Sequence, residues 1–222
     1  MNKQVLITIL FALAISVAHS KDECRPDFYI ISDFDDTIKT YGHDHEVARI
    51  GNALFRTKIN AGMDTLFQEM VGSAYEGQEE ACAGKNLFTV LTASPKMITC
   101  SIKRLLRKQN FTRYELITRP LREKTQPYKV DRVTKVSERE GVPLILIGDD
   151  TSRDAHAYHE FSEENPTEVL ETYIHNVRNE PNLPGQIKYV TTYEIALNEL
   201  VNSRLTVDAT LATGETLLSR ID

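Results

Sequence analysis

The chain has 222 residues, and its 26 Lys and Arg against 32 Asp and Glu give a formal charge of −6 at pH 7. Because nucleic-acid binding depends on a positive footprint, this balance argues against a nucleic-acid partner. The hydrophobic content of 41% is ordinary for a soluble globular protein, and the length suits one domain.

The first twenty residues have the pattern of a secretory signal peptide. Lys3 precedes an apolar run over residues 5–18, and the small residues Ala18 and Ser20 predict cleavage after Ser20. The run is too short to span a membrane comfortably, although an uncleaved anchor is the alternative. We therefore expect an exported protein, periplasmic or secreted, with a single domain over residues 21–222 and no membrane span after cleavage.

Export places the chain in an oxidising compartment, where disulfides persist. Three cysteines follow the proposed cleavage site: Cys24, Cys82 and Cys100. One disulfide and one free thiol is the simplest arrangement, and the sequence does not choose the pair. None of the three has the spacing of a zinc or redox site, so we expect them to be structural.

Apolar stretches of strand length alternate along the chain with segments whose apolar residues recur at helical spacing. The predicted strands cover residues 27–32, 86–91, 114–118, 144–147 and 169–174. The predicted helices cover residues 45–55, 63–70, 101–108, 127–140, 153–161 and 191–202. This alternation predicts an α/β fold with a Rossmann-like parallel sheet of about five strands. The last residues, 203–222, form either a final helix or a loose end.

Three of the predicted strands end in polar clusters. Asp33, Asp35 and Asp36 follow the first strand, Thr92 follows the second, and Asp149 follows the fourth. The carboxyl ends of parallel strands meet at one crevice, so we expect these side chains to converge. In extended backbone Asp33 and Asp35 would point to opposite faces, so the chain must turn between them. Carboxylates this close repel one another unless they share a cation, and Mg²⁺ fits that need.

The converging side chains include the groups that phosphoryl transfer to a carboxylate requires. Asp33 is the candidate nucleophile, which would form an aspartyl-phosphate, and Asp35 is the candidate general acid and base. Thr92 is the candidate hydrogen-bond donor to the phosphate, and Lys129 is the candidate cation beside it. For Mg²⁺ we expect Asp33, Asp149 and the backbone carbonyl of Asp35 as ligands.

Each of these groups also has a structural interpretation. Asp35 and its neighbours could simply form a turn, and Thr92 could cap the helix that follows it. Lys129 could be a solvated helix residue, and Lys124 and Lys135 compete for its role.

Other charged residues are expected to have structural roles. We expect Asp150 and Asp154 to hold the loop after the fourth strand rather than the metal ion. The basic run over residues 103–108 could touch anionic lipid, but a solvated helix face is the favoured interpretation.

The set of motifs resembles a known superfamily of phosphohydrolases. The sequence of residues 33–37, Asp-Phe-Asp-Asp-Thr after an apolar strand, is similar to the first motif of the haloacid dehalogenase superfamily. Thr92, Lys129 and Gly148-Asp149 stand where the second, third and fourth motifs are expected. The resemblance covers roughly residues 27–177. It implies a Mg²⁺-dependent phosphatase, and the short connection between the first two motifs predicts a small or absent cap.

A narrower resemblance is to the catalytic domain of the actin-patch-associated phosphatidate phosphatases and their bacterial relatives. It rests on residues 31–39, 91–95, 146–149 and 173–177. The chain departs from that family at Asp150-Thr151-Ser152, where Ser-Gly-Glu is usual, and at His175, where Arg is frequent. The resemblance implies a phosphorylated substrate, with phosphatidate or another bulky phosphoester as the candidate.

Two rival functions are a non-catalytic phosphate- or cation-binding interaction protein and a phosphotransferase of the same superfamily. The presence of both Asp33 and Asp35 favours an enzyme over a binding protein, because simple binding does not need the second acid.

Overall fold

The protein is described by a computed structural model that covers residues 24–39 and 59–220. The predicted signal peptide and the predicted helix over 45–55 lie outside these residues, as does much of the segment in which a cap would lie. The strands are β1 (Tyr29–Ser32), β2 (Phe88–Pro95), β3 (Tyr114–Arg119), β4 (Leu144–Asp149), β5 (Val169–His175) and β6 (Gln186–Tyr189). The helices are α3 (Met63–Ala74), η2 (Lys96–Ile98), α4 (Thr99–Lys108), α5 (Thr125–Glu140), α6 (Asp154–Glu164), α7 (Thr192–Val201) and α8 (Val207–Leu218).

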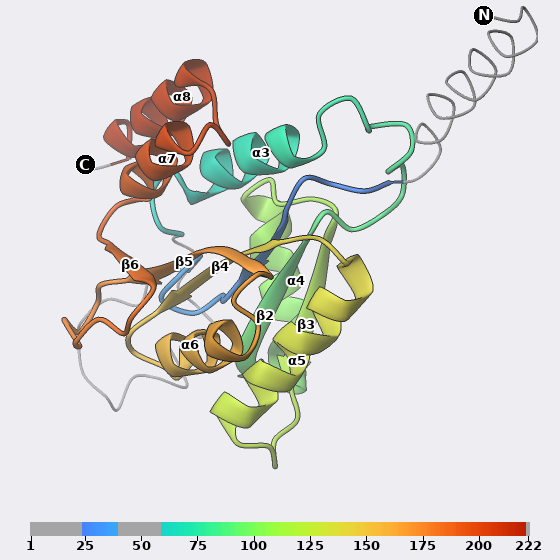
Figure 1. The fold of residues 1–222 in the computed structure, drawn as a ribbon, viewed down its shortest axis with the longest axis vertical. Helices are drawn as coiled ribbons and strands as arrows, with labels where there is room; N and C mark the ends of the chain where they lie inside the picture. Colours follow the sequence, from blue (N-terminus) through green and yellow to red (C-terminus); the bar gives the residue numbers. More distant parts are fainter. Residues whose placement is uncertain (1–23, 40–58, 221–222) are drawn as a thin grey trace, which may run out of the picture.

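The six strands form one parallel sheet in the order β3-β2-β1-β4-β5-β6 (Figure 1). The predicted α/β fold with a parallel sheet is therefore confirmed, and all five predicted strands are present. The sixth strand, β6, was missed. It has only four residues, two of them polar, and as an edge strand it pairs with β5 alone. Such a short, half-polar stretch has too little apolar pattern to be told from a loop.

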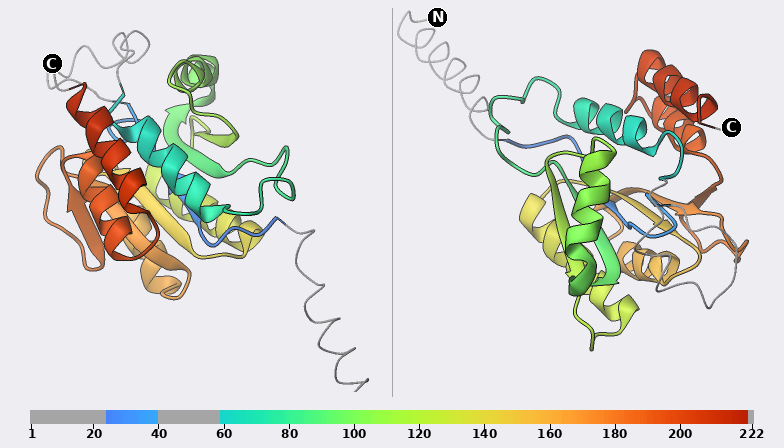
Figure 2. Two further views of the ribbon diagram at one scale, coloured as in Figure 1. Left: turned by 90° about the horizontal axis from the view of Figure 1, so that it is seen from above. Right: turned by 180° about the vertical axis from the view of Figure 1, so that it is seen from behind.

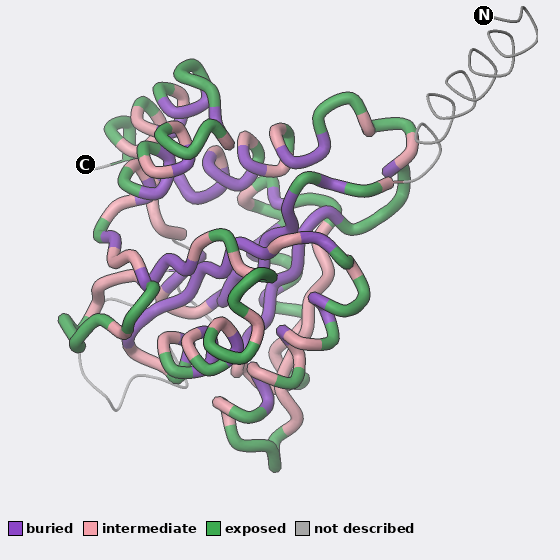
Figure 3. The backbone as a smooth tube through the Cα atoms, viewed as in Figure 1, coloured by how far each residue is buried: buried purple, intermediate pink, exposed green. Residues whose placement is uncertain are grey.

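Helices cover both faces of the sheet (Figure 2). The side chain of Ile30 joins a core with α3, α4 and α7, whereas its neighbours Tyr29 and Ile31 join a second core with α5 and α6. This alternation follows from the two-residue period of a strand. Every residue of β1 and β4 is buried, which is why both strands are apolar almost throughout (Figure 3). Among the described residues, no helix is both long and apolar enough to cross a bilayer.

The last segment of the chain is a helix, α8, and not a loose end. The Thr206 side chain caps its first turn by accepting a hydrogen bond from the Ala209 N–H at 3.2 Å. The helix packs on α3 and α7, and Arg220 forms a two-pronged ion pair with Asp64 of α3, at 2.9 Å for each bond. A Cβ at Gly62, where α3 begins with a φ of +78°, would lie 2.6 Å from Thr192 Oγ1, so this close packing requires glycine.

The order of the strands fixes where a site can form. The chain runs outward from β1 through β2 to β3 and then crosses back to β4 on the other side of β1. The two neighbours β1 and β4 therefore send their connections in opposite directions, which opens a crevice at their carboxyl ends. Asp33 follows β1, and Asp149 ends β4.

Cys24 and Cys82 form a disulfide, and Cys100 is free and exposed. The bond ties the start of the described chain to the segment after α3, across a separation of 58 residues. The expectation of one disulfide and one free thiol is confirmed, and the structure selects the pair.

Candidate active site

A tight turn after β1 brings its acids to one end of the sheet. The Asp33 N–H extends the ladder by donating to the Ile147 carbonyl at 2.8 Å. The Phe34 carbonyl then accepts from the N–H groups of Ile38 at 3.1 Å and Lys39 at 2.8 Å. Asp36 takes a φ of 57°, a conformation that Asp tolerates better than most residues. The predicted turn is present, so Asp35 is not sent to the opposite face.

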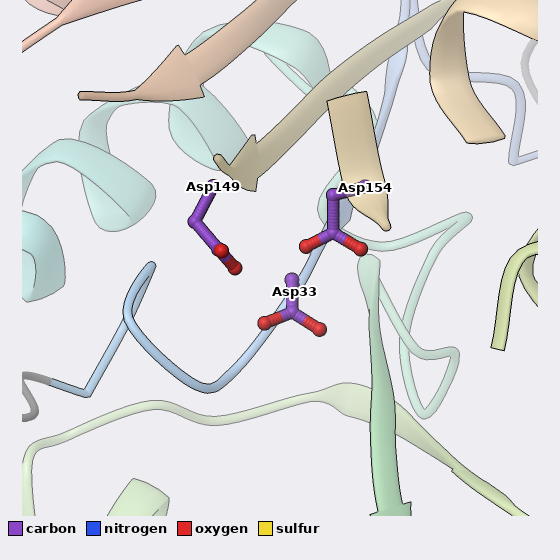
Figure 4. A group of neighbouring side chains, drawn as sticks. All are labelled: Asp33, Asp149 and Asp154. Carbon is purple, nitrogen blue, oxygen red and sulfur yellow. The ribbon is translucent and has the colours of Figure 1, made fainter. Parts of the chain in front are cut away.

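Three carboxylates meet at the switch point. Ligand-capable oxygens of Asp33, Asp149 and Asp154 lie within 4.8 Å of one another, and all three residues are buried. Figure 4 shows the side chains converging from the end of β1, the end of β4 and the start of α6. The predicted convergence of Asp33 and Asp149 is therefore seen, and Asp154 is an additional member.

Lys129 supplies the positive charge of this cluster. Its Nζ donates to Asp33 Oδ1 at 2.6 Å and also to Asp154 Oδ1, and the side chain is 0% exposed. Lys129 lies near the start of α5, on the buried side of that helix. The two competing lysines stand elsewhere: Lys124 is exposed before α5, and Lys135 pairs with Asp131 on the outer surface at 2.8 Å.

Burial and mutual repulsion govern the ionisation of the cluster. Desolvation, with repulsion from Asp154 next, raises the pKa of Asp33 well above its usual range, against the opposing field of Lys129. Burial also raises the pKa of Asp154 to about 7, with Lys129 again opposing and Asp149 adding to the rise. Burial alone would lower the pKa of Lys129, but the fields of Asp154 and Asp33 raise it well above its ordinary value. Lys129 is therefore a permanent cation.

A glycine allows α6 to approach the cluster. A Cβ at Gly148 would lie 2.6 Å from Asp154 Cβ and 2.8 Å from Tyr158 Cε2. Without that Cβ, the first residue of α6 turns its side chain inward onto Lys129. Our expectation that Asp154 holds the loop is corrected here, because spacing along the chain does not show how closely a helix packs on a strand.

Asp35 and Thr92 lie together beside the carboxylate cluster. Asp35 Oδ2 accepts from Thr92 Oγ1 at 3.3 Å and from Ser94 Oγ at 2.6 Å. Thr92 Oγ1 in turn accepts from the Ser94 N–H at 3.0 Å, so the bend after Thr92 holds both hydroxyls in place. Ser94 belongs to the polar cluster at the end of this strand, but sequence reasoning gave it no role. Lys39, which is buried, also lies near Asp35, and burial lowers its pKa against the raising effect of that carboxylate.

Asp149 is oriented by the loop that follows it. Its Oδ1 accepts from the N–H and the hydroxyl of Thr151, both at 2.6 Å, and from the Ser152 N–H at 2.9 Å. The Thr151 hydroxyl also lies 3.0 Å from Asp36 Oδ2, which links the loop to the turn after β1. These short-range bonds keep the Asp149 carboxylate facing the crevice.

Asp150 holds a loop, as expected, but the loop is the one after β5 and not the one after β4. It accepts from the N–H groups of Val177, Arg178 and Glu180 at 2.8–3.1 Å and from Lys188 Nζ at 3.2 Å. Although burial opposes it, these donors together lower the pKa of Asp150. Asp150 therefore fixes the loop after β5 and stays outside the carboxylate cluster.

A comparison with known protein families matches residues 28–176 to the family described as "Phosphatidate phosphatase APP1, catalytic domain". The matched region covers about two thirds of the chain. The chain belongs to this family. Membership makes it a phosphatase domain. Neither the curated proteins nor the solved structures contain a significant match.

The APP1 match runs from the residue before β1 to the residue after β5, so it contains Asp35 and the cluster of Asp33, Asp149 and Asp154. It also contains His175, one of the two departures noticed in the sequence. His175 Nδ1 lies 2.6 Å from the Asp36 carbonyl, and because a carbonyl only accepts, Nδ1 carries the proton. The ring stacks on Tyr189 of β6 with centroids 5.0 Å apart. The imidazole thus supports the turn after β1.

The close contact at Gly148 gives a test of how this APP1-family site is built. We expect Gly148→Ala to push α6 away from β4, to destabilise the domain by about 1–3 kcal/mol and to lower phosphatase activity. Urea unfolding and a phosphate-release assay measure the two effects. The matched control is Gly72→Ala in α3, where an added Cβ meets nothing within 4 Å and a slight gain in stability is expected. Equal behaviour of the two variants would contradict the packing described.

Proposed function

We propose that the protein is a Mg²⁺-dependent phosphatidate phosphatase that works through an aspartyl-phosphate, on the pattern of the haloacid dehalogenase superfamily. The observation that carries this proposal is the division of labour between two acids. Asp33 is buried at the switch point and paired with Lys129. Asp35 lies apart from this pair and accepts hydrogen bonds from the hydroxyls of Thr92 and Ser94. One carboxylate is thus placed to attack and the other to transfer protons.

The charge of the cluster fits a divalent cation. Among the described residues, three carboxylates face one ammonium group, and Asp154 Oδ2 is buried without a hydrogen-bond partner. An all-oxygen set with excess negative charge is the donor set that Mg²⁺ prefers. Asp33 and Asp149 would hold the ion, with Asp154 beside them and the Asp35 carbonyl as the further ligand expected from the sequence. When bound, the ion offsets negative charge on the phosphoryl oxygens.

The side chains divide the reaction into two displacements. A carboxylate oxygen of Asp33 forms a bond to phosphorus while the bond to the leaving oxygen breaks, and Asp35 gives that oxygen its proton. Lys129 stabilises the charge that develops beside Asp33. In the second half, Asp35 takes a proton from water, the water oxygen bonds to phosphorus, and phosphate leaves as the Asp33 carboxylate is restored.

Asp33→Asn and Asp35→Asn test these roles. We expect each to lower phosphate release from an aryl phosphate and from phosphatidate by at least about a thousandfold, because an amide is neither a nucleophile nor a proton carrier. Circular dichroism checks that the fold survives, and Asp131→Asn on the surface of α5 is the control with normal turnover. Wild-type turnover by the Asp33→Asn protein would refute the assigned nucleophile.

Magnesium binding has a readout that does not depend on turnover. At a hundredfold excess over Kd, Mg²⁺ should raise the melting temperature of the protein by about 5–10 °C. Asp149→Asn should remove most of that rise while keeping an oxygen that can accept from Thr151, and Asp131→Asn should keep the rise. EDTA should stop phosphate release. A Mg²⁺ shift that is unchanged in the Asp149→Asn protein would place the ion elsewhere.

We also propose export, supported by the signal-like first residues and the Cys24–Cys82 disulfide. A non-reducing peptide map of the exported protein should show a chain that begins at Lys21, with Cys100 alone open to a thiol reagent. Cys82→Ser should lower the free energy of unfolding by about 2–4 kcal/mol, while Cys100→Ser should change it by less than about 0.5 kcal/mol. An exported chain that keeps Met1 would contradict cleavage.

A further inference from the structure

Two large apolar side chains are exposed at the edge of the sheet that carries the site. Met97 is 82% exposed and Leu121 is 70% exposed. Each stands two residues beyond a strand end, and those ends, Pro95 of β2 and Arg119 of β3, are partners in the sheet register. Both residues therefore lie beyond the carboxyl ends of β2 and β3. This is also the end of β2 at which Thr92 lies.

The turn that carries Leu121 is held firmly against β2. Arg119 Nε donates to the Ala93 carbonyl at 3.0 Å, and Arg119 Nη1 donates to the Glu123 carbonyl. The Glu123 N–H closes the turn on the Pro120 carbonyl at 3.2 Å. The turn joins β3 to α5 at the lowest point of the molecule in Figure 1. Leu121 is thus presented to the surroundings by a hydrogen-bonded turn.

Exposed cations stand next to the two apolar residues in the sequence. Lys96 precedes Met97, Arg122 and Lys124 follow Leu121, and all three are exposed. One acid, Glu123, stands among them.

The adjoining segment of the sequence adds further positive charge. Residues 81–114 contain seven Lys and Arg and no Asp or Glu, although the whole chain has a net charge of −6. Four of the seven lie exposed on α4, which follows η2 along one face of the sheet (Figure 2): Lys103, Arg104, Arg107 and Lys108. The protein is therefore acidic overall, with a basic margin at β2, α4 and the β3–α5 turn.

We propose that this margin docks on an anionic phospholipid bilayer, with Met97 and Leu121 entering the interface and Lys96, Arg122 and Lys124 contacting headgroups. We call these five residues the docking rim. Exposed apolar residues flanked by cations match a surface that is apolar inside and negative at its boundary. A nucleic acid would use the cations but not the apolar tips.

The docking rim places the membrane next to the chemistry, and this part of the proposal rests on the proposed function. Met97 is three residues after Ser94, which binds Asp35. A phosphomonoester on a lipid headgroup would then reach the crevice without leaving the bilayer.

Vesicle binding tests the docking rim independently of turnover. The probe is phosphatidylcholine vesicles with or without phosphatidylglycerol, an anionic lipid without a phosphomonoester, in a flotation assay. We expect binding to the anionic vesicles alone, weakening as salt rises. The double change Met97→Ser with Leu121→Ser should weaken binding at least about tenfold, because less apolar area is buried.

A matched control removes similar apolar groups from another part of the surface. Val201 at the end of α7 and Val207 at the start of α8 are 81% and 58% exposed. Val201→Ser with Val207→Ser should leave vesicle binding unchanged. Separately, changing Lys96, Arg122 and Lys124 to Gln should weaken binding about fivefold for each cation removed.

Several outcomes would overturn the docking proposal. These are no binding to anionic vesicles, equal binding to neutral vesicles, equal losses in the two double variants, and tighter binding to heparin or an oligonucleotide with no contribution from Met97 and Leu121. The Asp33→Asn protein should dock normally. If vesicles are bound but the wild type releases no phosphate, the proposed function fails and the docking proposal stands. If phosphate is released without vesicle binding, the docking proposal fails and the proposed function stands.

Discussion

The site depends on one buried ammonium group. Lys129 lies between Asp33 and Asp154, away from solvent, where an uncompensated charge is very costly. Removing one partner from a buried pair of this kind commonly costs about 3–5 kcal/mol, so each of the three groups requires the others. In the part of the chain that the structure describes, the same arrangement leaves more negative than positive charge in the cluster. That excess fits a divalent cation, and after burial it is the second cause that raises the pKa of Asp33.

The topology of the sheet makes this charge cluster possible. The strands β1 and β4 are neighbours in the sheet, although their register partners Ser32 and Ile147 are 115 positions apart in the sequence. Gly148 then lets α6 approach closely enough for Asp154 to join from above. The N–H groups of Thr151 and Ser152 and the Thr151 hydroxyl, all in the loop after β4, orient the Asp149 carboxylate.

The charge of the whole molecule is divided unevenly. The segment 81–114 contains seven Lys and Arg and no Asp or Glu, whereas acidic residues outnumber basic ones in the whole chain. Because phosphate esters and anionic lipid headgroups are negative, an acidic protein needs such a basic margin to approach them. The net charge of −6 excludes a general attraction to polyanions but says nothing about one face.

The sequence by itself determined the fold class, the strands that carry the site and the first acids of the site, because apolar strands that end in Asp33 and Asp149 leave a periodic and local signal. It could not find β6, whose four residues have little pattern, or Ser94, whose role depends on where Asp35 turns. Only the tertiary structure decided that Asp154 faces Lys129, that Cys24 pairs with Cys82, and that Met97 and Leu121 share an edge. Each of these depends on distances between segments far apart in the chain, and such distances are set by packing and not by spacing in the sequence.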